Sequence, residues 1–501
     1  MKILLLEHPR NISQENINDI ANAPLSSSLF TGYIAALLSK EKKDEVEIIE
    51  GYLEKKTYDE IYKKICEFKP QVIGVHLVYQ WKTDWDLFKL FERLKSENKV
   101  EYVTAYGYYP NFAYKEVLDS CNAIDSIILG EPETPFYNLV DDIRNNKKHI
   151  ESKGIVYKKS NGQFHIQYEQ PFEQLDDLPF PIRTKASLGI GEVNIMGSRG
   201  CYGNCTFCYI NPFIGEKAKW RGRSAENIVK EIDEIIVNTK MRYFYFTDPN
   251  FFGPGIKGKE RVKKLATLLK KRNIKFGIEA RVNDIEEETI ECLVDAGLNH
   301  ILIGLESGKE ESLKRLNKMT TVEQNEEAIK ILRKYGINPN VGFIMFEPDS
   351  TIKDLRINFE FLKRNKLLYD LDITVNVLYH HMIILQGTKA YRQLQGEKRL
   401  IISPLSTYEG TAEYKNYEVA KFASIMRDVT NFIFLQLKKM WNKKEFNKES
   451  YKDNFANANE RLIQVFEKTL VLVEEGNNIT DEYMDKTIKK TKEYIKRYLM
   501  A

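Results

Sequence analysis

The chain has little cysteine, little net charge and no long hydrophobic run. Six cysteines among 501 residues argue against a secreted protein that is held together by disulfides. The 75 basic and 72 acidic residues leave a net charge of +3, so no overall positive field favours a nucleic acid as a partner. No stretch reaches about eighteen uninterrupted apolar residues, which is the length that a membrane-spanning helix needs. The first residues, MKILLLEHPR, turn polar too early for a signal peptide, and we expect a cytoplasmic protein.

The length and the apolar content predict more than one folded domain. With 501 residues the chain is too long for one hydrophobic core, and 43% of its residues are hydrophobic. Over residues 1–145, apolar runs alternate with stretches of helix length, which predicts a parallel, doubly wound sheet that binds ligands at the carboxyl ends of its strands. The runs expected as strands are 2–7, 45–50, 71–78, 102–107 and 126–131.

A connector and a second alternating segment follow. Residues 146–190 predict a linker, in which NGQFH is typical of a hairpin turn and LDDLPFPIR is stiffened by proline. Residues 191–395 predict a partial barrel of six βα units with its active site at the carboxyl ends of the strands. The expected barrel strands are 193–198, 243–248, 275–280, 300–306, 340–346 and 372–378. Residues 396–501 predict a helical, lysine-rich C-terminal domain, and the expected fold class is α/β.

Three of the six cysteines, Cys201, Cys205 and Cys208, gather in the stretch GSRGCYGNCTFCYI. This spacing lets three thiolates reach one face of a [4Fe–4S] cluster, whose closed electron-transfer form needs four ligands. With three ligands, one iron stays open for another molecule. A structural zinc site usually has a fourth ligand and often a second cysteine or histidine pair, and no such pair follows in the sequence. Zinc and three unrelated cysteines are the alternatives.

The stretch resembles the cluster loop of the radical S-adenosylmethionine (SAM) superfamily, with the aromatic Phe207 directly before the third cysteine. The resemblance implies that the open iron binds SAM and that an electron from the cluster cleaves SAM to a 5′-deoxyadenosyl radical. It extends over residues 190–390 through the segments FTDPNFF, ARVNDI, IGLESG and ILQGT. The residues implied for cofactor binding are Asp248, Pro249, Asn250, Glu279, Arg281, Glu306 and Ser307. Their structural alternatives are a strand-end cap for Asp248 and an internal ion pair between Arg281 and Glu306.

Two segments depart from the family pattern. The second strand has Thr-Asp-Pro in place of Gly-Gly-Glu, and the fifth has FIMFEPDST, in which Glu347 is a candidate to face substrate. Tyr379, His380 and His381 follow the expected sixth strand, and a histidine there could position substrate or move a proton. Adjacent residues on a strand face opposite sides, so at most one of the two histidines is expected to point inward. A structural role is the alternative.

The sheet of residues 1–145, joined to the barrel by LDDLPFP, resembles the cobalamin-binding subclass of this superfamily. The matching segments are APLSSSLFTGYIAALL, QVIGVHL and GEPE, together with a glycine at 107. The resemblance implies cobalamin over the carboxyl ends of the strands, with contacts from Ser26, Tyr79, Gln80, Trp81, Tyr106, Gly107, Tyr108, Gly130 and Glu131. His8 lacks the Asp-x-His-x-x-Gly context of a cobalt ligand, so histidine is not expected to bind cobalt. The resemblance implies that a residue after the third strand, Tyr79, Gln80 or Trp81, lies below the cobalt. The alternative is a sheet that no longer binds cobalamin, because YGYYPNF replaces the usual double glycine.

The resemblance implies a methyltransferase that passes methyl from methylcobalamin to an unactivated carbon or phosphorus after the radical removes hydrogen from the substrate. The substrate is expected to be a small molecule or a peptide, and the electron donor a flavodoxin or ferredoxin. A cobalamin radical enzyme that performs cyclisation, ring contraction or oxidation is the first alternative, and a non-catalytic iron–sulfur protein is the second. A methylthiotransferase would need three further cysteines upstream, where only Cys66 and Cys121 lie.

Overall fold

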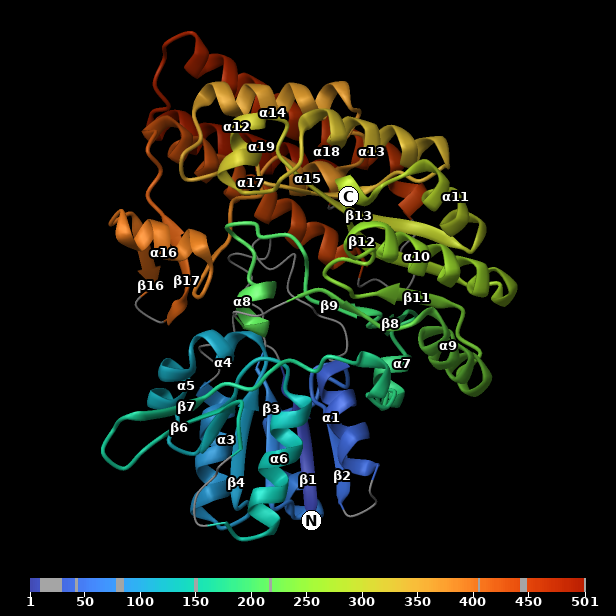
Figure 1. Ribbon diagram of the computed structural model, residues 1–501. Coiled ribbons are helices and arrows are strands. Elements are labelled where there is room, and N and C mark those ends of the chain that lie inside the picture. Colours follow the sequence, from blue (N-terminus) through green and yellow to red (C-terminus); the bar gives the residue numbers. More distant parts are fainter. Residues whose placement is uncertain are drawn as a thin grey trace.

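The N-terminal sheet is parallel over its first five strands, as the sequence predicts (Figure 1). The structure is a computed structural model, and it describes residues 1–9, 29–40, 44–77, 85–147, 152–215, 219–403, 406–441 and 448–499. The five strands are β1 (Lys2–Glu7), β2 (Glu45–Glu50), β3 (Val72–His76), β4 (Tyr102–Tyr106) and β5 (Ser126–Ile128). Their spatial order, β2-β1-β3-β4-β5, places the topological switch point between β1 and β3, where ligands of such sheets bind.

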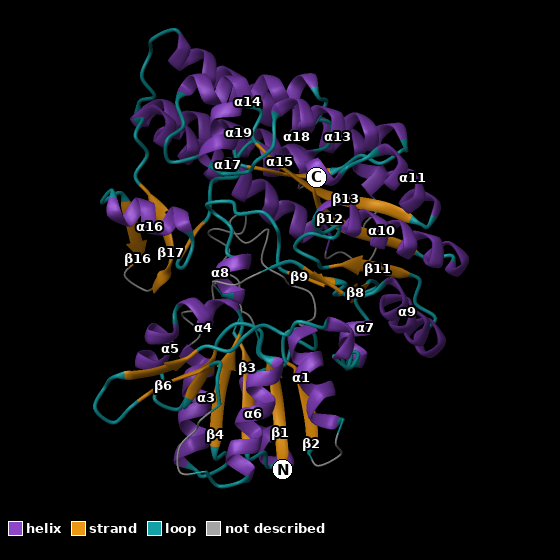
Figure 2. Cartoon of the chain, in the orientation of Figure 1, coloured by secondary structure: helices purple, strands orange, loops and turns teal. Residues whose placement is uncertain are grey.

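Helices cover both faces of this sheet (Figure 2). One face packs against α1 (Leu29–Ser39) and α6 (Glu133–Arg144), and the other against α2 (Tyr58–Phe68), α3 (Trp85–Ser96) and α5 (Tyr114–Ser120). A short helix, α4 (Tyr108–Phe112), follows β4 directly. Because the central strands β1 and β3 are buried on both sides, both faces need such a cover.

Part of the segment that the sequence predicts as a linker belongs to the sheet. The hairpin of β6 (Ile155–Lys158) and β7 (Phe164–Gln167) adds two antiparallel strands beside β5. The turn falls at the predicted NGQFH, where Gly162 adopts a φ of +80° that favours glycine. Only the stretch after β7, with the short helix α7 (Lys185–Leu188), connects the sheet to the barrel.

The central domain contains a second parallel sheet in the order β14-β13-β12-β11-β8. Its strands are β8 (Val193–Ile195), β11 (Tyr243–Phe246), β12 (Lys275–Arg281), β13 (Leu298–Glu306) and β14 (Asn340–Phe343). The helices between them are α8 (Ile210–Ile214), α9 (Ala225–Thr239), α10 (Gly255–Leu269), α11 (Glu287–Asp295), α12 (Glu310–Arg315) and α13 (Val322–Lys334), followed by α14 (Ile352–Arg364). A small ladder of β9 (Ser198–Arg199) and β10 (Arg221–Gly222) brackets the cysteine motif.

The segment expected as the sixth barrel strand, 372–378, is instead the helix α15 (Leu371–Val377), so that prediction was wrong. The side chain of Asp370 caps this helix by accepting a hydrogen bond from the backbone N–H of Asp372. The buried residues of α15 recur at the three- and four-residue spacing of a helix, which a short apolar run does not reveal by itself.

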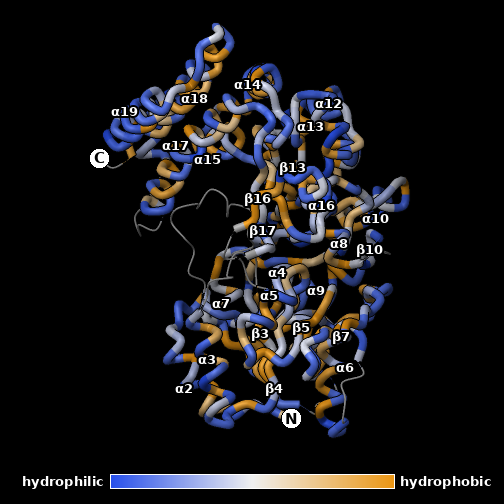
Figure 3. Tube along the Cα trace, turned by 90° about the vertical axis from the view of Figure 1, so that its left-hand side faces the viewer, coloured by the Kyte–Doolittle hydropathy of each residue, from blue (hydrophilic) through white to orange (hydrophobic). Residues whose placement is uncertain are grey.

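The C-terminal region is mainly helical, as the sequence predicts (Figure 3). It begins with α16 (Lys389–Gly396) and a three-stranded antiparallel sheet of β15 (Ile384–Leu385), β16 (Leu400–Ser403) and β17 (Ser406–Ala412). The long helices α17 (Tyr417–Trp441), α18 (Lys452–Glu474) and α19 (Asp481–Leu499) then pack onto the barrel and share its hydrophobic core. None of the helices in the described part of the chain is long and apolar enough to cross a membrane.

The packing of the N-terminal sheet predicts the effect of Gly74→Ala. An added Cβ would lie 2.4 Å from Cε2 of Phe136 and 2.9 Å from Cδ2 of Leu5, so the substitution overpacks a buried strand and should cost about 1–3 kcal/mol. Thermal unfolding followed by circular dichroism measures this loss. Gly396→Ala is the matched control, because nothing lies within 4 Å of its added Cβ. Equal melting temperatures for the two variants would contradict the packing described here.

Candidate active site

A cavity of about 250 Å³ opens at the carboxyl ends of the barrel strands. Cys201, Cys205 and Cys208 line it, so the fold brings the three cysteines of the sequence motif to one space. Five further residues proposed from the sequence also line this cavity, namely Phe207, Pro249, Glu279, Arg281 and Glu306. The segments that supply them come from four successive strand ends, which is where a barrel of this kind places its site.

Hydrogen-bond donors face two of the three sulfurs. The backbone N–H of Gly203 donates to Sγ of Cys201 over 3.3 Å, and Nη1 of Arg281 donates to Sγ of Cys205 over 3.6 Å. A side chain at 203 would displace the guanidinium of Arg281, because an added Cβ would lie 2.4 Å from its Nη1. The side chain of Asn211 fixes the loop by donating to the carbonyl of Gly203 over 2.8 Å. Donors placed in this way stabilise sulfur that carries negative charge, as metal-bound thiolate does.

The three cysteines are half-buried. Burial raises the pKa of Cys201, and it raises the pKa of Cys208 to about 12. Deprotonation of Cys201 and Cys208 at neutral pH therefore needs a bound metal, which replaces the proton. No group of three or more His, Cys, Asp or Glu within the described ranges is arranged to hold a metal ion. The three thiols instead surround a cavity, which suits a group larger than one ion.

Glu279 lies on β12, where its carboxyl group meets Tyr245 from β11. Removal from water raises the pKa of Glu279 to about 7, although the Tyr245 hydroxyl opposes this by donating to Oε1 over 3.2 Å. At neutral pH the group therefore exists in both protonation states, and the protonated form can donate a hydrogen bond into the cavity.

Glu306 reaches the cavity through a bulge at the end of β13. The register with β14 shifts between Gly304 and Glu306, and Glu306 adopts a φ of +63°. Its Oε1 accepts a hydrogen bond from Nζ of buried Lys318 over 2.8 Å. An added Cβ at Gly304 would lie 2.5 Å from this oxygen, so the glycine makes the room that the ion pair occupies. The pair thus places one anionic and one cationic group side by side at the cavity.

Asp248 and Asn250 lie behind the cysteine loop and do not line the cavity. Oδ1 of Asp248 accepts from the backbone N–H of Gly197 over 2.6 Å, and burial raises the pKa of Asp248 to about 6. Nδ2 of Asn250 donates to Asp284 over 2.9 Å, and Asp284 in turn accepts from the hydroxyl of Tyr202 in the loop. These contacts match the strand-end cap that was the alternative for Asp248.

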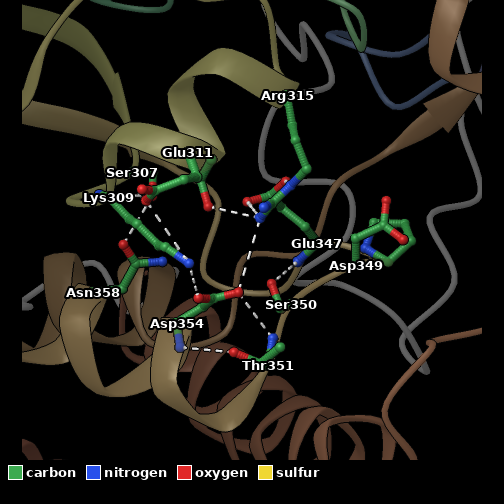
Figure 4. Close-up of polar contacts among 12 residues, drawn as sticks. Ser307, Lys309, Glu311, Arg315, Glu347, Asp349, Ser350, Thr351, Asp354 and Asn358 are labelled. Atoms are coloured by element: carbon green, nitrogen blue, oxygen red, sulfur yellow. Dashed lines mark hydrogen bonds and ion pairs between the residues drawn. The ribbon is translucent and has the colours of Figure 1, made fainter.

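Ser307 and Glu347 do not line the cavity either. They belong to a polar network between α12 and α14 (Figure 4). Oγ of Ser307 lies 2.9 Å from Oδ1 of Asn358. Glu347 accepts hydrogen bonds from Nε and Nη2 of Arg315 over 3.2 and 3.1 Å, and Arg315 also lies 3.9 Å from Asp354. Glu347 is only 4% exposed, and its buried carboxylate is paired with Arg315.

Tyr379, His380 and His381 follow α15 and lie beside the end of β14, outside the lining of the cavity. The carbonyl of His380 accepts a hydrogen bond from the backbone N–H of Met345 over 2.8 Å, and His381 forms a parallel bridge with Phe346. Burial lowers the pKa of His380 to about 4, so its ring is neutral at physiological pH.

A buried ion network joins the N-terminal sheet to the barrel. Arg199, two residues before the first cysteine of the motif, donates to Glu133 over 3.1 and 2.5 Å and lies 3.4 Å from Glu131. Arg221 donates to both carboxylate oxygens of Glu131 over 3.0 and 2.5 Å. We expected Glu131 to bind a cofactor, but its carboxylate forms ion pairs with two arginines of the barrel domain, Arg199 and Arg221.

The carboxyl edge of the N-terminal sheet faces the cysteine loop. The ring of Tyr108 lies 4.9 Å from that of Tyr209 and 4.5 Å from that of Phe213 in α8. Gly130 donates its N–H to Asn111 over 2.7 Å. Four residues proposed for cobalamin fall outside the described residues, namely Ser26, Tyr79, Gln80 and Trp81. The contacts of Tyr108 place the ligand edge of the sheet next to the cysteine motif.

Two observations at this edge fit a bound group. Gly107 adopts a φ of +117°, and an added Cβ would lie 2.6 Å from the carbonyl oxygen of Leu77, so the backbone approaches closely here. Next to it, Nε2 of His76 is buried and has no hydrogen-bond partner among the described residues. A buried polar atom without a partner costs about 1–3 kcal/mol, a cost that a ligand with a polar group would offset. Tyr106 fills part of the same edge, with its hydroxyl 2.7 Å from Oγ1 of Thr31.

Sequence reasoning missed several residues of both sites. Lys318, Lys389 and Arg392 line the cavity, but they lie outside every motif. His76 pairs with Glu7 at the other edge. The sequence held a signal for this pair, because Glu7 ends the apolar strand KILLLE and His76 ends the apolar strand VIGVH. No comparable signal marks the three cations, which tertiary packing alone brings to the cavity.

Comparison with known proteins identifies the central domain. Residues 195–362 match the model of the radical SAM superfamily. This part of the chain is a radical SAM domain. The family recognised from the cysteine motif is therefore confirmed.

The whole chain also has a known fold. It superposes over 100% of its length on 79% of OxsB, a cobalamin-dependent radical SAM enzyme solved with aqua-cobalamin and SAM, at a TM-score of 0.80 and 20% identity. It is 26% identical to an uncharacterized methyltransferase of Pyrococcus horikoshii over 74% of this chain and 79% of that protein. It is 29% identical to the 4′-phospho-dehydrooxetanocin synthase of Priestia megaterium over 75% of this chain and 54% of that protein. The expected α/β fold class is thus confirmed.

The raised pKa of Glu279 predicts a pH-dependent stability. Since the pKa is about 7 in the folded chain and 4.5 ordinarily, the folded state binds more protons between these values, and stability falls as pH rises through that window. Glu279→Gln should remove the contribution of Glu279 to this fall, while that of buried Asp248 remains, and it should exceed the wild type by about 3 kcal/mol above pH 7. Urea unfolding of the cofactor-free chain at about pH 5 and about pH 8 measures the difference. Glu234→Gln, on the exposed face of α9, is the control, and identical pH profiles for E279Q and wild type would refute the assignment.

Proposed function

We propose that this chain is a cobalamin-dependent radical SAM enzyme that methylates an unactivated carbon or phosphorus of a small molecule or peptide. One observation carries the proposal: Cys201, Cys205 and Cys208 line a single cavity with Arg281 and Glu306. The match of the whole chain to the fold of OxsB supports the second cofactor. A flavodoxin or ferredoxin would serve as the electron donor.

The donor set of the cavity fits an iron–sulfur cluster and SAM. Cys201, Cys205 and Cys208 would hold a [4Fe–4S] cluster through three irons. When bound, the cluster and SAM supply a 5′-deoxyadenosyl radical, and cobalamin supplies a methyl group. Arg281 holds its guanidinium beside Cys205 and thereby stabilises negative charge on that sulfur.

The charged groups opposite the cysteines suit the methionyl part of SAM, which carries an ammonium and a carboxylate. Glu306 would bind the ammonium and Lys318 the carboxylate, because the two side chains already lie 2.8 Å apart at the cavity. Their ion pair keeps each group paired while the site is empty of ligand, so neither is left as an uncompensated buried charge. Protonated Glu279 would donate a hydrogen bond to an oxygen or nitrogen of the bound nucleoside.

The joined domains would hold two ligands at short range. Arg199, which lies just before the cysteine loop, binds Glu133 of the N-terminal domain. The ring of Tyr108 contacts the ring of Tyr209, the residue directly after Cys208. A substrate held between the carboxyl edges of the two sheets would meet groups from both. A reactive radical reacts efficiently with its substrate only when the two are already held in the correct geometry.

A second function keeps both cofactors without methyl transfer. The synthase of Priestia megaterium, at 29% identity, is named for a product and not for a methyl transfer, whereas the relative from Pyrococcus horikoshii is named a methyltransferase. A cyclisation, ring contraction or oxidation therefore remains the competing proposal for this chain.

The cysteine assignment predicts the effect of Cys205→Ser. In anaerobically reconstituted chain with a chemical reductant, release of 5′-deoxyadenosine from SAM should fall by at least about 100-fold, since even outer partners of metal ligands cost 10–100-fold. Cys66→Ser is the matched control, because Cys66 is a half-buried thiol on α2 in the other domain, and it should keep wild-type release. Release of 5′-deoxyadenosine by C205S at the wild-type rate would contradict the proposal.

Methyl transfer predicts a second product from SAM. With a true substrate, S-adenosylhomocysteine should form together with 5′-deoxyadenosine, because one SAM donates methyl and another yields the radical. Mass spectrometry of both nucleosides over the time course measures their ratio. Substrate conversion with 5′-deoxyadenosine but without S-adenosylhomocysteine would favour the competing function.

A further inference from the structure

The switch point of the N-terminal sheet carries a histidine–carboxylate pair. Glu7 is the last residue of β1 and His76 the last residue of β3, and the two are direct neighbours in the parallel register. The switch point lies between these two strands, so the pair sits where a doubly wound sheet binds its ligand. The residues come from sequence positions 69 apart, so only the folded sheet brings them together.

The pair is buried and its geometry fixes the ring. Nδ1 of His76 lies 3.0 Å from both carboxylate oxygens of Glu7, and His76 and Glu7 are 5% and 2% exposed. Thr31 donates its hydroxyl to Oε1 of Glu7 over 2.5 Å. Because the carboxylate accepts at Nδ1, the proton of a neutral imidazole resides there and Nε2 keeps its lone pair.

Nε2 is the one ring atom of His76 that still needs a polar partner. Tyr106 stacks on the ring with centroids 5.4 Å apart, and Nε2 has no hydrogen-bond partner within the described part of the chain. Residue 107 cannot cover it with a side chain, since an added Cβ would lie 2.8 Å from Cδ2 and 3.1 Å from Nε2. Glycine at 107 thus leaves the polar edge of the imidazole beside the ligand edge of the sheet.

From this geometry we infer that His76 binds the corrinoid, with Nε2 accepting a hydrogen bond from an amide or hydroxyl of that cofactor. Glu7 is a positioning residue that holds the ring in the accepting tautomer. The chemistry matches, because a corrinoid carries primary amides and a ribose hydroxyl that donate hydrogen bonds. The inference rests on the proposed function, and it adds a binding residue to the cobalamin site.

Titration of the full-length chain with hydroxocobalamin, without SAM or reductant, tests the inference. His76→Ala should weaken binding about 10-fold, which corresponds to the loss of one hydrogen bond. His76→Gln keeps an acceptor and should lose less, and Glu7→Gln should fall between these two. Thr104→Ala is the control, because Thr104 is also buried, on neighbouring β4, and in the described part of the chain its hydroxyl bonds Ser126, so this variant should bind as the wild type does.

Two results would overturn the inference. The first is equal affinity of H76A and wild type, with circular dichroism showing both folded. The second is a nitrogen splitting in the electron paramagnetic resonance spectrum of the cob(II)alamin-loaded wild type that H76A loses, because His76 would then be a cobalt ligand and not a hydrogen-bond acceptor. Neither readout depends on SAM cleavage, so a failure of the proposed reaction with intact, His76-dependent binding leaves the inference standing.

Discussion

The bidentate contact of Arg199 with Glu133 is the interaction on which the arrangement of this chain depends. Arg199 stands two residues before Cys201, and Glu133 begins α6 of the N-terminal sheet. Both are buried, so a loss of Arg199 would leave the carboxylate of Glu133 without this partner, at a cost of about 3–5 kcal/mol. The start of the cysteine loop is therefore fixed to the other domain, and not only to its own barrel.

This attachment makes the carboxyl edges of two parallel sheets meet. Each edge is the place where its sheet binds ligands, for a reason that lies in strand topology and not in sequence. The barrel edge collects thiols and charged side chains around a cavity, whereas the other edge presents glycine backbone and a histidine–carboxylate pair. The meeting of the two edges explains how one chain can use two cofactors on one substrate.

Local patterns predicted most strands and the metal motif. β1 and β2 begin and end where their apolar runs do, and the three cysteines meet because their spacing keeps them on one loop. The error at 372–378 arose because a short, mainly apolar run of seven residues is compatible with a strand or a helix. The side chain of Asp370 caps the helix that forms there. Lys318 could not be found from sequence, because its partner Glu306 lies on another element, and the pairing of His76 with Glu7 appears only when β1 and β3 lie side by side.

The most direct test of the account is the electron paramagnetic resonance spectrum of the reduced, cluster-loaded chain before and after SAM is added. Three cysteine ligands leave one iron open, so SAM should bind that iron and shift the g-values of the reduced cluster. A spectrum that SAM leaves unchanged, or the absence of a cluster after anaerobic reconstitution, would contradict the claim that Cys201, Cys205 and Cys208 form an open site.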